Sequence, residues 1–131
     1  MNYSRINNLT GWGMFLIALV VYLLTMAPTA SYWDCGEFIA CANELEVPHP
    51  PGAPFFLLLG RIFAMLSFGD VSNVAFMLNI MSVLSASFTV LFTFWITTHL
   101  GRKMMVGMEG SPTQTQTIVI MGAGLVAGLA N

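Results

Sequence analysis

The sequence predicts an all-α, polytopic membrane protein, and three observations carry this prediction. Of its 131 residues, 56% are hydrophobic and only 8% are charged, whereas soluble domains usually carry about 25% charged residues. The run Val74–Thr98 contains no charged residue and is long enough to cross a bilayer as a helix. The chain has only four cations and they form no basic patch, which argues against a nucleic-acid partner and leaves the lipid bilayer as the main surrounding.

Three apolar runs are the predicted membrane spans. Gly11–Ala27 is at the short limit for crossing the hydrocarbon core, and Pro28 ends it. Val74–Thr98 is the clearest span. The third run, 117–131, stops at the last residue, so we expect residues 1–131 to be one N-terminal fragment of a larger transmembrane domain.

The first run has an alternative interpretation as a cleaved signal peptide. Only Arg5 supplies a basic region before it, and Pro28 would occupy the −3 position for cleavage after Ala30. Both features favour an uncleaved transmembrane helix.

Small and polar residues predict the faces on which the spans pack. Within the second span they recur at helical spacing, and the third run carries a Gly-xxx-Gly pair. These residues are Asn79, Ser82, Ala86, Thr89 and Thr93 in the second span and Gly124 and Gly128 in the third.

The cations predict the topology. Arg5 precedes the first span and Arg102-Lys103 follow the second, so both ends should be cytoplasmic and residues 28–73 external. This requires that Pro54–Phe68 does not cross. As a helix it would be about 22 Å long, short of the roughly 30 Å core, and Arg61 in its middle would be costly there. We therefore expect a juxtamembrane helix.

The external segment carries an acidic face. We expect a helix at the membrane surface over about residues 31–46, on which Asp34 and Glu37 lie one turn apart and the face continues through Cys41 to Glu44. Carboxylates beside a bilayer are costly and predict a functional site. The alternative for Asp34 is structural, because Ser31 and Asp34 together resemble a capping box.

Cys35 and Cys41 are predicted to remain unpaired. In a helix they would be about 9 Å apart along the axis, and disulfides need Cα atoms closer than about 7 Å. They form no CxxC motif and no recognisable zinc site.

A proline-rich turn, Val47–Pro54, follows the acidic segment and contains His49. Its prolines predict a stiff, extended connection. Pro54 suits the first position of the next helix.

This order of elements resembles the GT-C membrane glycosyltransferases, which include the protein O-mannosyltransferases. In that family the first external loop holds an acidic motif, then a His-Pro-Pro stretch and a juxtamembrane helix. The counterparts here are Asp34 and Glu37, His49-Pro50-Pro51, and Pro54–Phe68. The acidic pair is adjacent in the mannosyltransferases but separated by Cys35 and Gly36 here. The chain is similar above all to a bacterial family, long a domain of unknown function, related to those enzymes.

The resemblance implies a GT-C-like N-terminal part of an enzyme in the bacterial inner membrane, with residues 28–73 periplasmic. It would move a mannose-like sugar from a polyprenyl-phosphate donor to an acceptor hydroxyl on a protein or glycan. Asp34 would be the general base and Glu37 would orient it or the acceptor. Trp33, His49 and Arg61 would bind substrate. No cofactor is assigned, but the leaving phosphate needs a cation, for which a divalent metal is one option.

The alternative is a non-enzymatic polytopic membrane protein, such as a transporter or an assembly subunit. Transporters carry polar groups in broken helices near the bilayer midplane. Here the acids lie outside the predicted spans, which favours the transferase. Two spans and part of a third cannot enclose a lipid donor and an acceptor, so we expect residues 1–131 alone to be inactive.

Overall fold

The computed structural model describes residues 2–50, 52–107 and 110–130, and every regular element in these ranges is a helix, as predicted. The chain forms two compact units, which are described separately. Residues 1–22 and 85–131 make the first unit, and residues 23–84 make the second.

Within the described part of the chain, two helices are long and apolar enough to cross a membrane. They are α1 (Tyr3–Thr25) and α4 (Val74–Val106), the latter preceded by the short 3-10 helix η1 (Val71–Asn73). α4 extends well past Thr98 and ends where Gly107 adopts φ 82° and donates its N–H to the carbonyl oxygen of Lys103 at 3.1 Å. This left-handed glycine cap terminates the helix, and Gly101 does not interrupt it.

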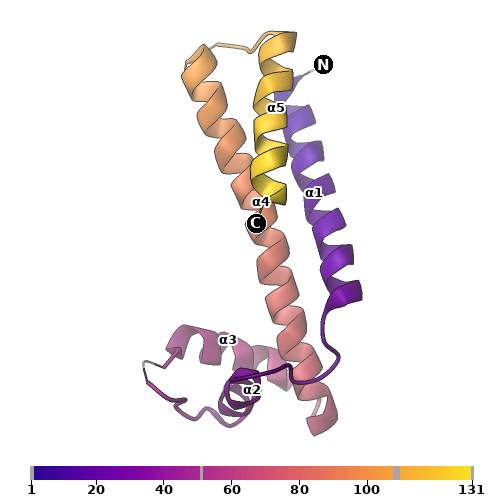
Figure 1. The fold of residues 1–131 in the computed structure, drawn as a ribbon, viewed down its shortest axis with the longest axis vertical. Helices are drawn as coiled ribbons and strands as arrows, with labels where there is room; N and C mark the ends of the chain where they lie inside the picture. Colours follow the sequence, from indigo (N-terminus) through magenta and orange to yellow (C-terminus); the bar gives the residue numbers. More distant parts are fainter. Residues whose placement is uncertain (1, 51, 108–109, 131) are drawn as a thin grey trace. The chain divides into compact units, whose positions relative to one another are not determined.

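In the first unit, α1 and α5 (Gln114–Leu129) lie beside the C-terminal part of α4 (Figure 1). Thr113 caps α5 in a full capping box with Gln116, so this helix begins upstream of the predicted run. Buried Met14, Val90, Phe94 and Met121 form the core of the unit.

The glycine pair of α5 lies at helix contacts of the first unit. A Cβ atom on Gly124 would lie 2.6 Å from Cγ2 of Thr98 and 2.9 Å from Cδ2 of Phe94. One on Gly128 would lie 2.6 Å from Cε of Met14. Absence of a side chain therefore allows the close approach of α5, as small-residue faces do in membrane helices.

The cationic ends of α1 and α4 lie at the same end of the first unit. The Tyr3 hydroxyl donates to the carbonyl oxygen of Thr98 at 3.3 Å, and the Arg102 guanidinium lies over the Tyr3 ring at 5.5 Å from its centroid. Arg5 follows in the same first turns of α1. The two helices are antiparallel, so their cations are gathered together.

In the second unit, α2 (Cys35–Glu44) and α3 (Pro54–Met65) pack on each other and on the start of α4 (Figure 1). Their shared core contains Cys41, Ala42, Leu57, Ala64, Val74 and Leu78. A Cβ on Gly60 would lie 3.0 Å from that of Ala42, so glycine here lets α3 approach α2 closely.

Both short helices are shorter than predicted. α2 does not begin near residue 31, because Trp33 adopts the left-handed conformation with φ 64°. Leu45, at φ 57°, ends it, and the Glu46 N–H bonds to the Cys41 carbonyl oxygen at 3.0 Å. Pro54 begins α3 as predicted, but the helix stops at Met65, and Phe68 has φ 52°.

Candidate functional site

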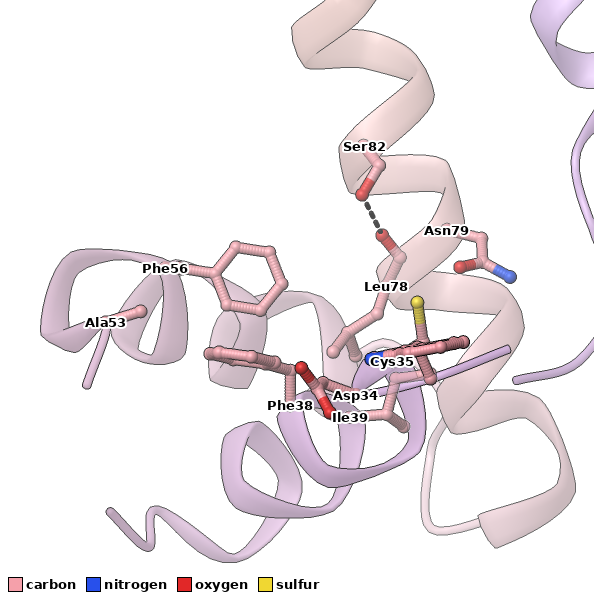
Figure 2. A pocket seen from close by; sticks show the side chains of 10 residues that line it. Asp34, Cys35, Phe38, Ile39, Ala53, Phe56, Leu78, Asn79 and Ser82 are labelled. Carbon is pink, nitrogen blue, oxygen red and sulfur yellow. Dashed lines mark hydrogen bonds between the residues drawn. The ribbon is translucent and has the colours of Figure 1, made fainter. Parts of the chain in front are cut away.

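The second unit contains a pocket of about 580 Å³ between α2, α3 and the start of α4 (Figure 2). Its size and largely apolar lining are typical of small-molecule sites. Among its lining residues Asp34 is the single carboxylate. The lining residues are Trp33, Asp34, Cys35, Phe38, Ile39, Ala53, Phe56, Leu78, Asn79 and Ser82.

Asp34 is the N-cap residue of α2, and its side chain makes no capping hydrogen bond. The predicted capping box with Ser31 is therefore wrong, because the helix begins at Cys35 and not after Ser31. Asp34 has φ −74° and ψ −2°, which is already helical backbone. A capping carboxylate needs extended backbone to reach the first N–H groups, so this one remains available to the pocket.

Glu37 makes its contacts with the proline-rich turn. Its Oε1 accepts the backbone N–H of His49 at 2.8 Å, and its Oε2 lies 2.9 Å from His49 Nδ1. These hydrogen bonds lower the pKa of the Glu37 carboxyl, and the same carboxylate raises the pKa of His49. Asp34 and Glu37 thus have separate surroundings, although they are one turn apart in sequence.

The predicted continuous acidic face is also interrupted. Cys41 is buried in the core of the second unit, while Cys35 is exposed at the pocket. Burial, with Glu37 and Glu46 nearby, raises the pKa of the Cys41 thiol. Both cysteines are free, which confirms that they do not pair.

Arg61 lies outside the pocket lining. Its guanidinium donates to the carbonyl oxygen of Asn43, in the last turn of α2. A cation there stabilises the carboxyl end of the helix. A contact between Arg61 and a substrate phosphate stays a prediction.

Trp33 lines the pocket with a side chain that is 93% exposed. Its left-handed backbone is uncommon for a bulky residue. Strained positions of this kind concentrate at functional sites. A contact between Trp33 and substrate stays a prediction. The flat apolar ring of Trp33 is the surface that would make this contact.

Sequence reasoning did not place two polar residues of α4 in the site. Asn79 and Ser82 were assigned to helix packing, yet both line the pocket. The Asn79 amide donates to the carbonyl oxygens of Ala27 at 2.7 Å and Thr29 at 3.1 Å. It thereby ties the chain after α1 to the start of α4. An amide near the N-terminal end of α4, rather than another hydroxyl, was the available signal.

Within the described ranges, no three His, Cys, Asp or Glu side chains gather in a group that could hold a metal. The site is therefore built from one carboxylate, two polar side chains of α4 and an apolar wall. This arrangement can accept a proton at Asp34 and receive an apolar ligand beside it.

Comparison with known proteins gives the family. Residues 34–131 match the family model described as the protein O-mannosyl-transferase TMEM260 N-terminal domain. The chain is 32% identical over 91 residues to a protein O-mannosyl-transferase tmem260 of Dictyostelium discoideum, covering 66% of this chain and 11% of that protein. It is 31% identical over 98 residues to the TMEM260 protein of Mus musculus, covering 72% of this chain and 14% of that protein. No solved structure matches.

The match begins at Asp34 and includes the acidic segment, the proline-rich turn, α3, α4 and α5. It extends over three quarters of the chain, and the matched part of each relative is a small share of its length. The chain therefore belongs to the TMEM260 N-terminal-domain family of the protein O-mannosyl-transferases.

Proposed function

We propose that the complete protein is a membrane glycosyltransferase that moves mannose from a polyprenyl-phosphate donor to a hydroxyl of an acceptor protein. Family membership supports mannosyl transfer, because the relatives are named protein O-mannosyl-transferases. The single observation that carries the site assignment is that Asp34, alone among the described residues, brings a carboxylate to the pocket. The chain spans only 11% and 14% of the two relatives, so the activity is proposed for the complete protein.

The reaction needs a base, an aligned donor and a cation for the leaving phosphate, and the source of that cation stays a prediction. Asp34 takes the proton of the acceptor hydroxyl as its oxygen attacks the anomeric carbon. The bond from that carbon to the phosphate oxygen breaks, the new glycosidic bond forms, and polyprenyl phosphate leaves with the electron pair. Attack opposite the phosphate inverts the anomeric centre.

The other pocket residues suit a donor with an apolar tail and a polar head. Phe38, Phe56 and Leu78 supply the apolar wall that the first units of a polyprenyl chain would contact. Asn79 uses its NH₂ group on two backbone carbonyls. Its oxygen is left to accept a hydrogen bond from a sugar hydroxyl.

The donor is the part of the proposal that a direct assay tests. The complete protein in proteoliposomes should transfer mannose from polyprenyl-phosphate mannose to a Ser/Thr-containing acceptor peptide. A nucleotide-activated mannose should give no product, because its polar nucleotide cannot replace a polyprenyl chain on the apolar wall of the pocket. Product formed from the nucleotide sugar and not from the lipid would contradict the proposal.

We also propose that residues 28–73 face the external side. The gathering of Arg5 with Arg102 at one end of the first unit supports this, because the positive-inside rule puts that end in the cytoplasm. A GT-C architecture for the complete protein and a bacterial inner-membrane location stay predictions.

The two cysteines allow a test of the membrane side on which residues 28–73 lie. Cys35 is exposed and Cys41 is buried, so a membrane-impermeant maleimide added outside intact cells should label Cys35. The label on this segment, located by mass spectrometry, should be lost in the Cys35→Ala variant and kept in Cys41→Ala. Labelling of Cys35 only after the membrane is permeabilised would place this segment in the cytoplasm and contradict the topology.

A further inference from the structure

Both carboxylate oxygens of Glu37 bind one residue, His49. One accepts the His49 backbone N–H at 2.8 Å, and the other lies 2.9 Å from its ring Nδ1. Paired charge-assisted hydrogen bonds fix orientation as well as distance. Glu37 does not line the pocket, although Asp34, one turn before it, does.

We propose that Glu37 and His49 form a clamp that holds the proline-rich turn on α2 and thereby sets the pocket wall beside Asp34. Glu37 is then a positioning residue and does not touch substrate. This inference rests on the proposed function, in which Asp34 is the base. It assigns different roles to the two carboxylates: Asp34 reacts with the acceptor, and Glu37 holds the pocket wall in position.

The clamp reaches the pocket through an aromatic chain. The His49 ring meets Phe38 edge-on, with centroids 5.9 Å apart, and Phe38 meets Phe56 edge-on at 5.8 Å. Both phenylalanines line the pocket. Edge-to-face contacts have defined geometry, so release of His49 would remove the support of Phe38 on its outer side.

The backbone gives a second connection. The Gly52 N–H bonds to the His49 carbonyl oxygen at 3.1 Å, and Gly52 adopts φ 73°. Ala53, the next residue, lines the pocket and is the N-cap of α3. Proline on either side of His49 stiffens this stretch. Fixing His49 therefore fixes where α3 begins.

The clamp should depend on pH in a defined way. The folded pKa of Glu37 is lowered, so its stabilising contribution is complete above its ordinary value of about 4.5 and is lost as pH falls through the lowered value. The folded pKa of His49 is raised, so its contribution is complete below about 6.5 and is lost as pH rises through the raised value. The charge of Asp34 contributes less than Glu37 to the raised pKa of His49, and the charges of Glu37 and Glu46 contribute to the raised pKa of the buried Cys41 thiol.

The test compares two substitutions at one position in the complete protein. Glu37→Gln keeps a side-chain oxygen for the His49 N–H and an amide for the neutral ring, whereas Glu37→Ala keeps neither. We expect Glu37→Gln to retain transfer within about fivefold at pH 7.5, since its lost interaction is one charge-assisted bond. Glu37→Ala should lose about tenfold to hundredfold, the cost of misplacing a site wall. Glu44→Gln on the same helix, outside the pocket, is the matched control and should behave as wild type.

A carboxylate that acts on substrate would give a different pattern. Glu37→Gln and Glu37→Ala would then both lower the rate of mannosyl transfer as much as Asp34→Asn does. This result would overturn the clamp. If Asp34→Asn keeps full transfer, the proposed function fails instead, and the clamp is judged by a readout that does not use activity.

That readout is the titration of His49. Comparing the NMR spectrum of the His49→Asn variant with that of wild type assigns the ring signals of His49 in isotope-labelled protein. The pKa of His49 should lie above its ordinary value in wild type and return toward it in Glu37→Gln. An unchanged pKa in Glu37→Gln would show that the two side chains do not pair, whatever the activity.

Discussion

Asp34→Asn is expected to lower mannosyl transfer by the complete protein by about 10²-fold to 10⁴-fold, the usual contribution of a positioned general base. Asparagine has nearly the shape of aspartate and still offers a hydrogen-bond acceptor, but it cannot take a proton. The loss should therefore appear in kcat, with little change in the KM for the lipid donor. The measurement is initial rate against donor concentration in proteoliposomes.

The Asp34 substitution should leave the fold intact. The side chain lies at the helix start and makes no capping hydrogen bond, so its replacement removes no capping contact of α2. Membrane insertion, melting temperature and the rate of Cys35 alkylation should match wild type. Asp34→Glu keeps the proton acceptor one methylene further out and should recover part of the rate. Normal transfer by Asp34→Asn would remove Asp34 from the mechanism.

The sequence predicts the fold where an element depends on local residues and not on contacts between distant parts of the chain. The uncharged run Val74–Thr98 predicts a span because hydrocarbon tolerates few polar groups. Pro54 predicts the start of α3 because its missing N–H is harmless there. Helix ends were harder. Trp33 and Phe68 adopt left-handed backbone without being glycine, and local sequence gives no reason to expect this.

The site was predicted in part for a similar reason. Helical spacing places Asp34 and Glu37 near each other, but it cannot say what each one contacts. The partner of Glu37 is His49, across the proline-rich turn, and that contact depends on how the turn folds back. Asn79 was missed because its partners Ala27 and Thr29 lie far away in sequence. Pro51, in the His-Pro-Pro stretch, lies outside the described residues.

Gly124→Leu is expected to destabilise the first unit by about 2 kcal/mol or more. Overpacking of a filled interior costs typically about 1–3 kcal/mol, and leucine recovers about 1 kcal/mol of helix propensity over glycine. The new Cβ would lie 2.6 Å from Thr98 and 2.9 Å from Phe94. Both of those side chains are fully buried, so neither can move aside without displacing others.

Gly122→Leu is the matched control, because it makes the same chemical change one half-turn earlier in α5. Nothing lies within 4 Å of a Cβ at Gly122, so leucine there should be neutral or slightly stabilising. Thermal unfolding of the two variants and wild type in one detergent gives the comparison. Equal melting temperatures for Gly122→Leu and Gly124→Leu would mean that α5 does not pack on α4 through Gly124. A lower melting temperature in Gly124→Leu alone identifies the contact between Gly124 and α4, since the changes in helix propensity and hydrophobicity are the same in both variants.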